Sequence, residues 1–200
     1  MFQDERNLRP TRHRHWGTAL TLWLAVLLLP CLASGDGHAK VSPARVEAAF
    51  LRNFAHYLTW PAAAFPDGQA PWRICILGTD PFGEVLEETF RGRAEHGRTF
   101  AITRAATTAE LPACHVVYIG HRARESRRAA LADLANRPVL TVSDAPGFLQ
   151  EGGMIRFKVS DRVEFGINLD STNAAALRIP AKVLEVAHEV IENGTARKRR

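Results

Sequence analysis

The sequence has few of the residue patterns on which enzymes depend. None of its histidines stands four residues from another, so the HxxxH and HExxH spacings of zinc sites are missing. It also has no GxSxG motif, the turn that presents a nucleophilic serine in one large class of hydrolases. No nucleophile stands beside a base in a recognisable pattern. The sequence therefore predicts a protein without catalytic residues, a metal ion or a cofactor.

Excess positive charge is missing from the body of the chain, although the 200 residues together carry a net charge of +5. The first 33 residues contain four arginines and two acidic residues, and the C-terminal RKRR adds four basic residues. Without these two ends, 18 basic residues stand against 19 acidic ones. A nucleic-acid interface needs basic residues gathered on one folded face, so no nucleic-acid partner is predicted. Residues 193–200 are predicted to be a basic, disordered tail.

Long apolar segments are limited to one run, from about Ala19 to Leu29. It follows four arginines and precedes the small residues Ala33, Ser34 and Gly35, the layout of a secretory signal. A bilayer core needs about 20 apolar residues, so the run is short for a membrane anchor, which is the alternative interpretation. We expect residues 1–35 to be a signal peptide with cleavage near 33–35, and the mature protein to be exported.

Cysteine is scarce, with three in the chain and one of them, Cys31, inside the expected signal peptide. Cys75 and Cys114 remain after export. In an oxidising compartment an even pair predicts a disulfide, and two buried free thiols are the alternative.

One glycine pair raises the possibility of a phosphate-binding loop. Gly78 and Gly83 have the six-residue spacing of that loop, but Glu84-Val85 follows where Lys-Ser/Thr is required. Asp80 and Pro81 instead predict an N-cap and a first helical residue, which places negative charge where a phosphate would bind. Nucleotide binding is therefore not expected here.

Strand and helix patterns alternate along the chain. Helices are predicted over 43–58, 80–90 and 124–137 and in the region 171–192, with Ser42 as the first N-cap and Pro180 marking a later helix start. Buried strands are predicted around 72–78, 98–105, 115–120 and 138–144, and a hairpin over 152–169. This order predicts a single α/β sandwich with a largely parallel sheet, helices on both faces and a C-terminal hairpin plus helices.

Four polar or aromatic residues are candidates for a pocket or contact surface. On the first helix, Val46, Ala49, Phe50, Asn53, Phe54 and Tyr57 share one face. A buried Asn53 either bonds to the backbone of an adjacent loop or lines a site with Trp60. Asp144 follows a predicted strand, where α/β proteins often bind ligands, although capping of a turn before Pro146 is the simpler use. Asn168 completes the set.

Six segments, taken in order, resemble the YfiR family. They are AAFLRNFAHYLTWP (48–61), ICILGTDPFG (74–83), CHVVYIG (114–120), VLTVSD (139–144), GGMIRF (152–157) and VEFGINLDSTNAAALRIPAKVLEVA (163–187). The resemblance covers about 150 residues and implies a YfiR-like α/β domain over 41–192. By the same resemblance Cys75 and Cys114 match a disulfide pair of the family. A second cysteine pair of some relatives is missing, and Gly166 stands where the family usually has a charged or larger residue.

The resemblance implies a periplasmic regulator of cyclic-di-GMP signalling and biofilm formation. Such a protein binds the periplasmic part of an inner-membrane diguanylate cyclase and restrains it. An OmpA-like outer-membrane lipoprotein is implied as a second partner, and homodimerisation is implied as well. The alternative function is a small-molecule-binding periplasmic sensor module that acts on a different membrane signalling protein. An enzyme of unrecognised type is the third interpretation.

Overall fold

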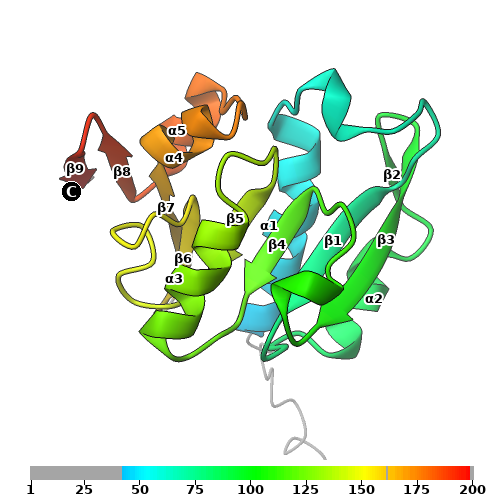
Figure 1. Ribbon diagram of the computed structural model, residues 1–200, viewed down its shortest axis with the longest axis horizontal. Coiled ribbons are helices and arrows are strands. Elements are labelled where there is room, and N and C mark those ends of the chain that lie inside the picture. The colour runs from blue at the N-terminus through cyan, green and yellow to red at the C-terminus, as the bar shows by residue number, and fades with distance from the viewer. Residues whose placement is uncertain (1–41, 161, 199–200) are drawn as a thin grey trace, which may run out of the picture. The chain divides into compact units, whose positions relative to one another are not determined.

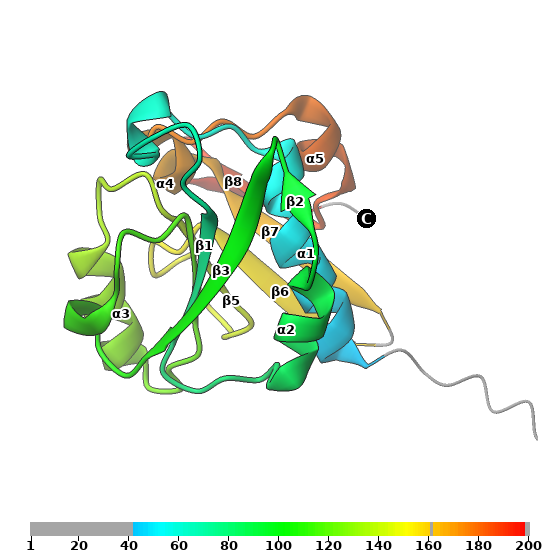
Figure 2. The ribbon, with the colours of Figure 1, turned by 90° about the vertical axis from the view of Figure 1, so that its right-hand side faces the viewer.

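The computed structural model describes residues 42–160 and 162–198. The expected signal peptide and its cleavage site lie outside these residues. Within them the chain forms a nine-stranded, mostly parallel sheet with helices on both faces, which confirms the predicted fold class (Figure 1). Figure 2 shows the sheet between α3 on one side and α1 and α2 on the other.

The sheet has the strand order β2-β3-β1-β4-β5-β6-β7-β8-β9. The strands are β1 (Trp72–Leu77), β2 (Ala94–Glu95), β3 (Arg98–Ala105), β4 (Val116–Ile119), β5 (Leu140–Ser143), β6 (Ile155–Val159), β7 (Val163–Asn168), β8 (Glu189–Glu192) and β9 (Thr195–Lys198). Strands β3, β1, β4, β5 and β6 run parallel, because helices or loops return the chain to the same end of the sheet each time. The predicted hairpin is present as the antiparallel pair β6 and β7.

The helices lie between the strands in the chain. They are α1 (Pro43–Tyr57), η1 (Ala62–Ala64), α2 (Glu84–Phe90), η2 (Thr108–Glu110), α3 (Arg124–Asp133), α4 (Leu169–Ala174) and α5 (Ala181–Val186). As predicted, Ser42 caps α1 and its side chain accepts a hydrogen bond from the Arg45 backbone N–H. Pro180 immediately precedes α5.

Several element boundaries differ from the sequence prediction. Helix α2 begins at Glu84 rather than at Asp80, because the carboxylate of Asp80 accepts hydrogen bonds from the Phe82 and Gly83 N–H groups and forms a turn there. Residues Glu189–Glu192 form strand β8, not the end of a helical region. Residues Thr195–Lys198, which were expected in a disordered tail, form β9 and pair with β8 around Asn193-Gly194.

The inward face of α1 also differs from the predicted one. The residues buried against the sheet and α2 include Ala48, Leu51, Phe54 and Ala55. Phe50 and Asn53 are only partly buried, and Tyr57 is 40% exposed. The helix therefore has two apolar stripes, one that is buried in the core and a second that faces β7 and α5.

Candidate functional site

The second stripe of α1 forms one wall of an apolar groove. Eight residues line this groove, which has a volume of about 280 Å³: Phe50, Asn53, Phe54, Tyr57, Phe165, Lys182, Val183 and Val186. They come from α1, β7 and α5, which are brought together because β7 lies beneath α1 and α5 follows it along the chain. The sequence predicted Asn53 and its apolar neighbours as one face, and Phe50, Asn53 and Tyr57 of this face line the groove, whereas Phe54 also belongs to the core.

Aromatic rings pack together at the floor of the groove, and its rim is exposed. The rings of Phe50 and Phe165 are 5.3 Å apart in an edge arrangement, and those of Phe50 and Phe157 are 5.8 Å apart. On the rim, Val186 is 67% exposed and Tyr57 40% exposed. Large exposed apolar side chains around a preformed hollow are typical of a contact surface for a protein or an apolar ligand.

Two polar groups mark the groove. The Lys182 ammonium lies 4.4 Å from the centre of the Tyr57 ring, a cation–π contact that holds the ring at the rim. The Asn53 side-chain oxygen accepts a hydrogen bond from Arg52 at 3.4 Å. Asn53 therefore brings a partly exposed amide to an otherwise apolar wall, where it can fix the orientation of a bound group.

Trp60 does not lie in this groove. It is 7% exposed and packs on Trp72 with ring centres 5.1 Å apart. Its indole N–H donates to the His115 carbonyl oxygen at 3.2 Å. The structure thus separates Asn53 from Trp60, which the sequence analysis had joined in one hypothesis, and gives Trp60 a place in the core beside a different hollow.

His115 belongs to the same core cluster as Trp60. Its Nδ1 atom accepts a hydrogen bond from the Arg73 backbone N–H at 3.0 Å, and its ring stacks on Phe65. Burial lowers the pKa of His115 to about 4, so the imidazole is neutral at physiological pH. This histidine therefore has a packing role, which the sequence alone did not indicate.

A smaller, polar hollow of about 180 Å³ lies at the carboxyl ends of β1, β4 and β5. Its lining includes Thr79, Tyr118, His121, Arg122 and Asp144. Asp144 is exposed here, and the turn that follows is formed by Ser143, whose hydroxyl accepts from the Ala145 N–H and donates to the Ile119 carbonyl. Ser143, not Asp144, therefore caps this turn. The exposed carboxylate of Asp144 makes this end of the sheet a second candidate site.

A buried ion pair fills one side of the polar hollow. The Arg127 guanidinium donates to both carboxylate oxygens of Glu151, at 2.8 and 2.7 Å, and also to the carbonyl oxygens of His121 and Arg122. This pairing lowers the pKa of Glu151 and raises that of Arg127. Because its donors are occupied, Arg127 joins α3 to the loop before β6 rather than offering charge to a ligand.

Two buried ionisable groups lie near Asp144 that the sequence analysis did not identify. Glu47 on α1 is 4% exposed, and burial, with a contribution from the charge of Asp144, raises its pKa to about 7. Tyr118 is 1% exposed, and burial raises its pKa, as do the charges of Asp144 and Glu47. A glutamate at this position could be recognised only once the orientation of α1 was known.

The remaining residues singled out from the sequence stabilise the fold and do not line either hollow. Cys75 and Cys114 form a disulfide with an S–S distance of 2.03 Å, as predicted. Asn168 caps α4 by accepting from the Ser171 N–H at 3.0 Å, and its amide donates to the Leu149 carbonyl at 2.9 Å. Gly166 allows a close approach, because a Cβ there would lie 2.8 Å from a side-chain carbon of Leu149.

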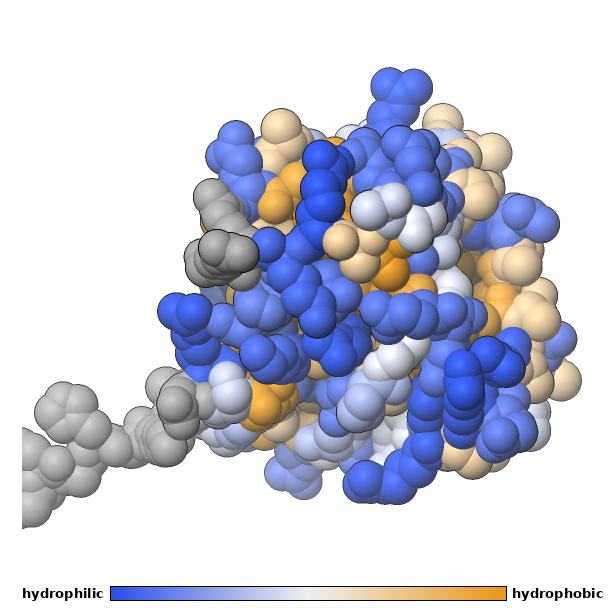
Figure 3. Space-filling model, turned by 90° about the vertical axis from the view of Figure 1, so that its left-hand side faces the viewer, coloured by the Kyte–Doolittle hydropathy of each residue, from blue (hydrophilic) through white to orange (hydrophobic). Residues whose placement is uncertain are grey.

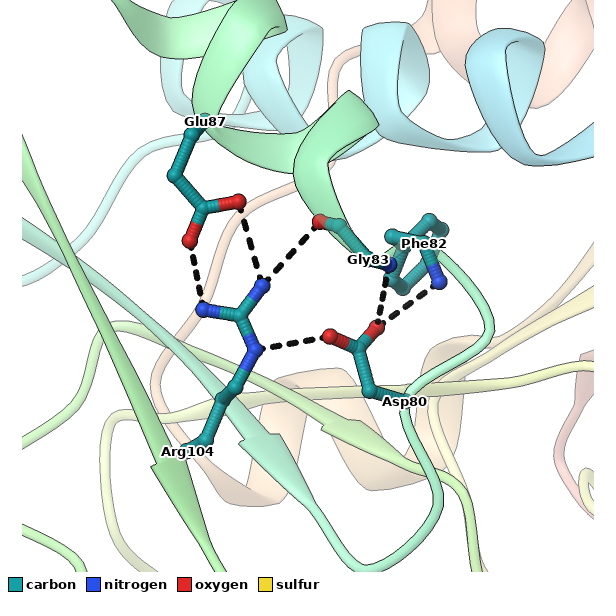
Figure 4. Close-up of polar contacts among 5 residues, drawn as sticks. All are labelled: Asp80, Phe82, Gly83, Glu87 and Arg104. Carbon is teal, nitrogen blue, oxygen red and sulfur yellow. Dashed lines mark hydrogen bonds and ion pairs between the residues drawn. The ribbon is translucent and has the colours of Figure 1, made fainter.

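The glycine loop after β1 is occupied by side chains of the protein (Figure 4). Asp80 accepts from the loop N–H groups through one oxygen, while its other oxygen accepts from Arg104 Nε at 2.7 Å. Arg104 also pairs with Glu87, and this pairing lowers the pKa of Glu87. The loop thus anchors α2 to β3.

Within the residues that the structure describes, no group of three or more His, Cys, Asp or Glu side chains could hold a metal ion. No described helix is long and apolar enough to cross a bilayer.

A protein-family model described as YfiR/HmsC-like matches residues 44–188. The match includes α1, the groove, the disulfide and the strands up to the start of β8.

Proposed function

The chain belongs to the YfiR/HmsC-like family, and from this premise we propose that it is a periplasmic regulatory protein that binds and restrains an inner-membrane diguanylate cyclase. The apolar groove is the observation that supports this proposal. It offers the exposed hydrophobic surface that a protein partner needs.

The disulfide supports the proposed periplasmic location. A bridge between Cys75 and Cys114 fits an oxidising compartment, because cytosolic thiols are kept reduced. The proposed sequence of events is export, oxidation, and then contact between the groove and the periplasmic part of the cyclase. An OmpA-like outer-membrane lipoprotein is proposed as a second partner that withdraws the protein from the cyclase.

The cellular level of cyclic-di-GMP tests the proposal. A strain that lacks the gene should have a raised level, which the native gene should restore. Val186→Asp should fail to restore it, because the substitution places a charge on the groove rim. Val159→Asp is the matched control, since Val159 is 44% exposed and lies outside the groove. An unchanged cyclic-di-GMP level in the deletion strain would refute the proposal.

The polar hollow supports the second candidate function, a periplasmic module that senses a small molecule and acts on another membrane signalling protein. Asp144 and the exposed Arg122 offer groups of both charges beside it. A metabolite that raises the melting temperature of the native chain, but not of Asp144→Asn, would favour this function over the first.

A further inference from the structure

The polar hollow at the carboxyl ends of β1, β4 and β5 contains a carboxylate without a basic partner. Asp144 lines this hollow and is exposed there. Among the described residues, no lysine, arginine or histidine forms an ion pair with it. Arg127, which lines the same hollow, pairs with Glu151 at 2.7 Å instead. No ion pair within the described fold therefore neutralises the charge of Asp144.

Carboxylates in other parts of the molecule do have basic partners. The side that carries β8 and β9 is mostly hydrophilic (Figure 3). On the neighbouring strand β7, Glu164 lies 2.7 Å from Arg162 and 3.3 Å from Lys158. Near the opposite edge of the sheet, Asp80 pairs with Arg104 at 2.7 Å. A carboxylate that lines a hollow without such a partner is a group to which a cation from solution can bind.

Two buried acidic groups lie near this carboxylate. Tyr118 is 1% exposed and lines the hollow, and no described residue forms a short hydrogen bond with its hydroxyl. Glu47 is 4% exposed. Burial raises the pKa of both residues, and the charge of Asp144 raises it further. The Tyr118 hydroxyl is therefore able to accept a hydrogen bond from a ligand, and Glu47 holds a proton that a nearby positive charge would displace.

These groups favour an organic cation over a metal ion. In residues 42–160 and 162–198, no three His, Cys, Asp or Glu side chains are placed to hold a metal ion. A primary ammonium group has three N–H donors and no acceptor, and it can donate to the Asp144 carboxylate and the Tyr118 hydroxyl. The hollow has a volume of about 180 Å³, less than the pockets that hold drug-sized ligands. The cation must therefore be small.

We propose that the polar hollow binds the primary ammonium group of a small organic molecule, which donates hydrogen bonds to Asp144 and Tyr118 while Glu47 releases its proton to the solvent. This proposal rests on the second candidate function and names the class of its ligand. The exchange follows from charge, because a cation next to Asp144 replaces the proton that offsets the two carboxylates. Binding of the ammonium group is therefore linked to pH.

The groups around Glu47 determine the sign of this linkage. Tyr118 on β4 and Asp144 after β5 lie near it, and neither can carry a positive charge. On α2, which packs against α1, Glu88 pairs with Arg45. Strands β6 and β7 present phenylalanine rings to α1. No described basic side chain therefore offsets the charge of an ionised Glu47, so the ligand does, and affinity rises with pH.

Titration of the oxidised native chain with ethylamine, followed by NMR at constant ionic strength, tests the site. We expect saturable binding, and we expect Asp144→Asn to weaken it at least about tenfold, because a charge-assisted hydrogen bond is lost. Glu84→Gln is the matched control, since Glu84 is exposed on α2 outside the hollow, and it should leave the dissociation constant unchanged. Propionate has a similar size and the opposite charge and should not bind. Absence of ethylamine binding, or equal binding of propionate, would overturn the proposal.

The pH dependence tests the role of Glu47. From pH 5 to 8 the dissociation constant of the native chain should fall about tenfold for each unit by which the ammonium group lowers the pKa of Glu47. An alkyl ammonium group stays charged over this range, as lysine does. His121 also lines the hollow, so the variant Glu47→Gln identifies the titrating group. Its dissociation constant should not change with pH, and a pH profile equal to that of the native chain would contradict the proton exchange.

Failure of this proposal is distinguishable from failure of the sensor function. If a metabolite without an ammonium group stabilised the native chain but not Asp144→Asn, the sensor function would stand and the ammonium proposal would be wrong. If ethylamine bound with the expected dependence on Asp144 and Glu47, and Asp144→Asn still restored signalling in the deletion strain as the native gene does, the ammonium site would stand and the sensor function would be wrong.

Discussion

Under α1 and α2, one face of the sheet packs a large cluster of aliphatic and aromatic side chains, whereas the face under α3 packs a smaller one. The larger cluster includes Leu51, Phe54 and Phe157, all almost fully buried. The smaller one contains the disulfide and is bordered by the Arg127–Glu151 ion pair. The two faces are thus stabilised differently.

The difference explains where the domain can expose apolar surface. Burial of apolar area contributes roughly 25 cal/mol per Å², so the cluster under α1 stabilises its face without cross-links. That face can therefore leave Tyr57 and Val186 exposed at the groove. The α3 face has less apolar area to bury and depends on one covalent bond and one buried ion pair. The contact surface is therefore expected on the α1 face of the sheet, and the disulfide and the ion pair stabilise the α3 face.

Removing the disulfide should have the largest effect on stability. The bridge closes a loop between residues 39 apart, for which the chain-entropy model gives about 4 kcal/mol as an upper value. The double variant Cys75→Ser, Cys114→Ser should unfold at correspondingly lower urea concentration, and a reductant should then have no further effect. A native chain whose urea midpoint is the same with and without reductant would contradict the claim that the disulfide stabilises the α3 face.

Breaking the buried ion pair should have the next largest effect. Glu151→Gln leaves the Arg127 guanidinium buried beside a neutral group and should lower the free energy of unfolding by about 3 kcal/mol. The pKa of Glu151 is lowered in the folded state, so its contribution is present above the unfolded pKa and is lost as the pH falls through the folded pKa. The variant should therefore lose less stability in acid than the native chain. If the native chain and Glu151→Gln lost the same free energy of unfolding in acid, the Arg127–Glu151 ion pair would not contribute to stability.

Replacing Glu47 should have the smallest effect on the free energy of unfolding, and it should stabilise the protein where the other two changes destabilise it. Its pKa is raised from 4.5 to about 7, so the folded state holds the extra proton and stability falls as the pH rises through that range. Glu47→Gln should raise the free energy of unfolding at pH 8 by roughly 1–2 kcal/mol, less than the full shift because water and Asp144 respond. Urea midpoints measured from pH 5 to 8 should be flatter for the variant. An unchanged slope would mean that Glu47 is solvated.

The sequence predicted the order of elements better than the direction in which α1 faces. Its apolar residues lie on two adjacent stripes, and spacing alone selected the stripe with Phe50, Asn53 and Tyr57. Only packing against the strands shows that Ala48, Leu51 and Ala55 face the sheet and that the first stripe lines the groove. The buried Glu47 was missed for the same reason.

The C-terminal strands were missed because composition outweighed a local signal. Asn193-Gly194 is a strong hairpin turn, and both residues adopt positive φ in the structure. The basic run after it predicted a solvated tail, yet Thr195–Lys198 pair with β8. An edge strand can be basic because only one of its sides is paired. The disulfide was predicted from the cysteine count, since only two cysteines remain after the leader.

Direct binding to the periplasmic part of the proposed cyclase partner is the measurement closest to the central proposal, that the groove is the contact surface. Titration of that partner with the oxidised native chain and with Val159→Asp should give the same dissociation constant. Val186→Asp should raise it at least about 30-fold, the equivalent of about 2 kcal/mol for a charge placed in a desolvated contact, while melting at the native temperature. Equal affinity of the native chain and Val186→Asp would contradict the account.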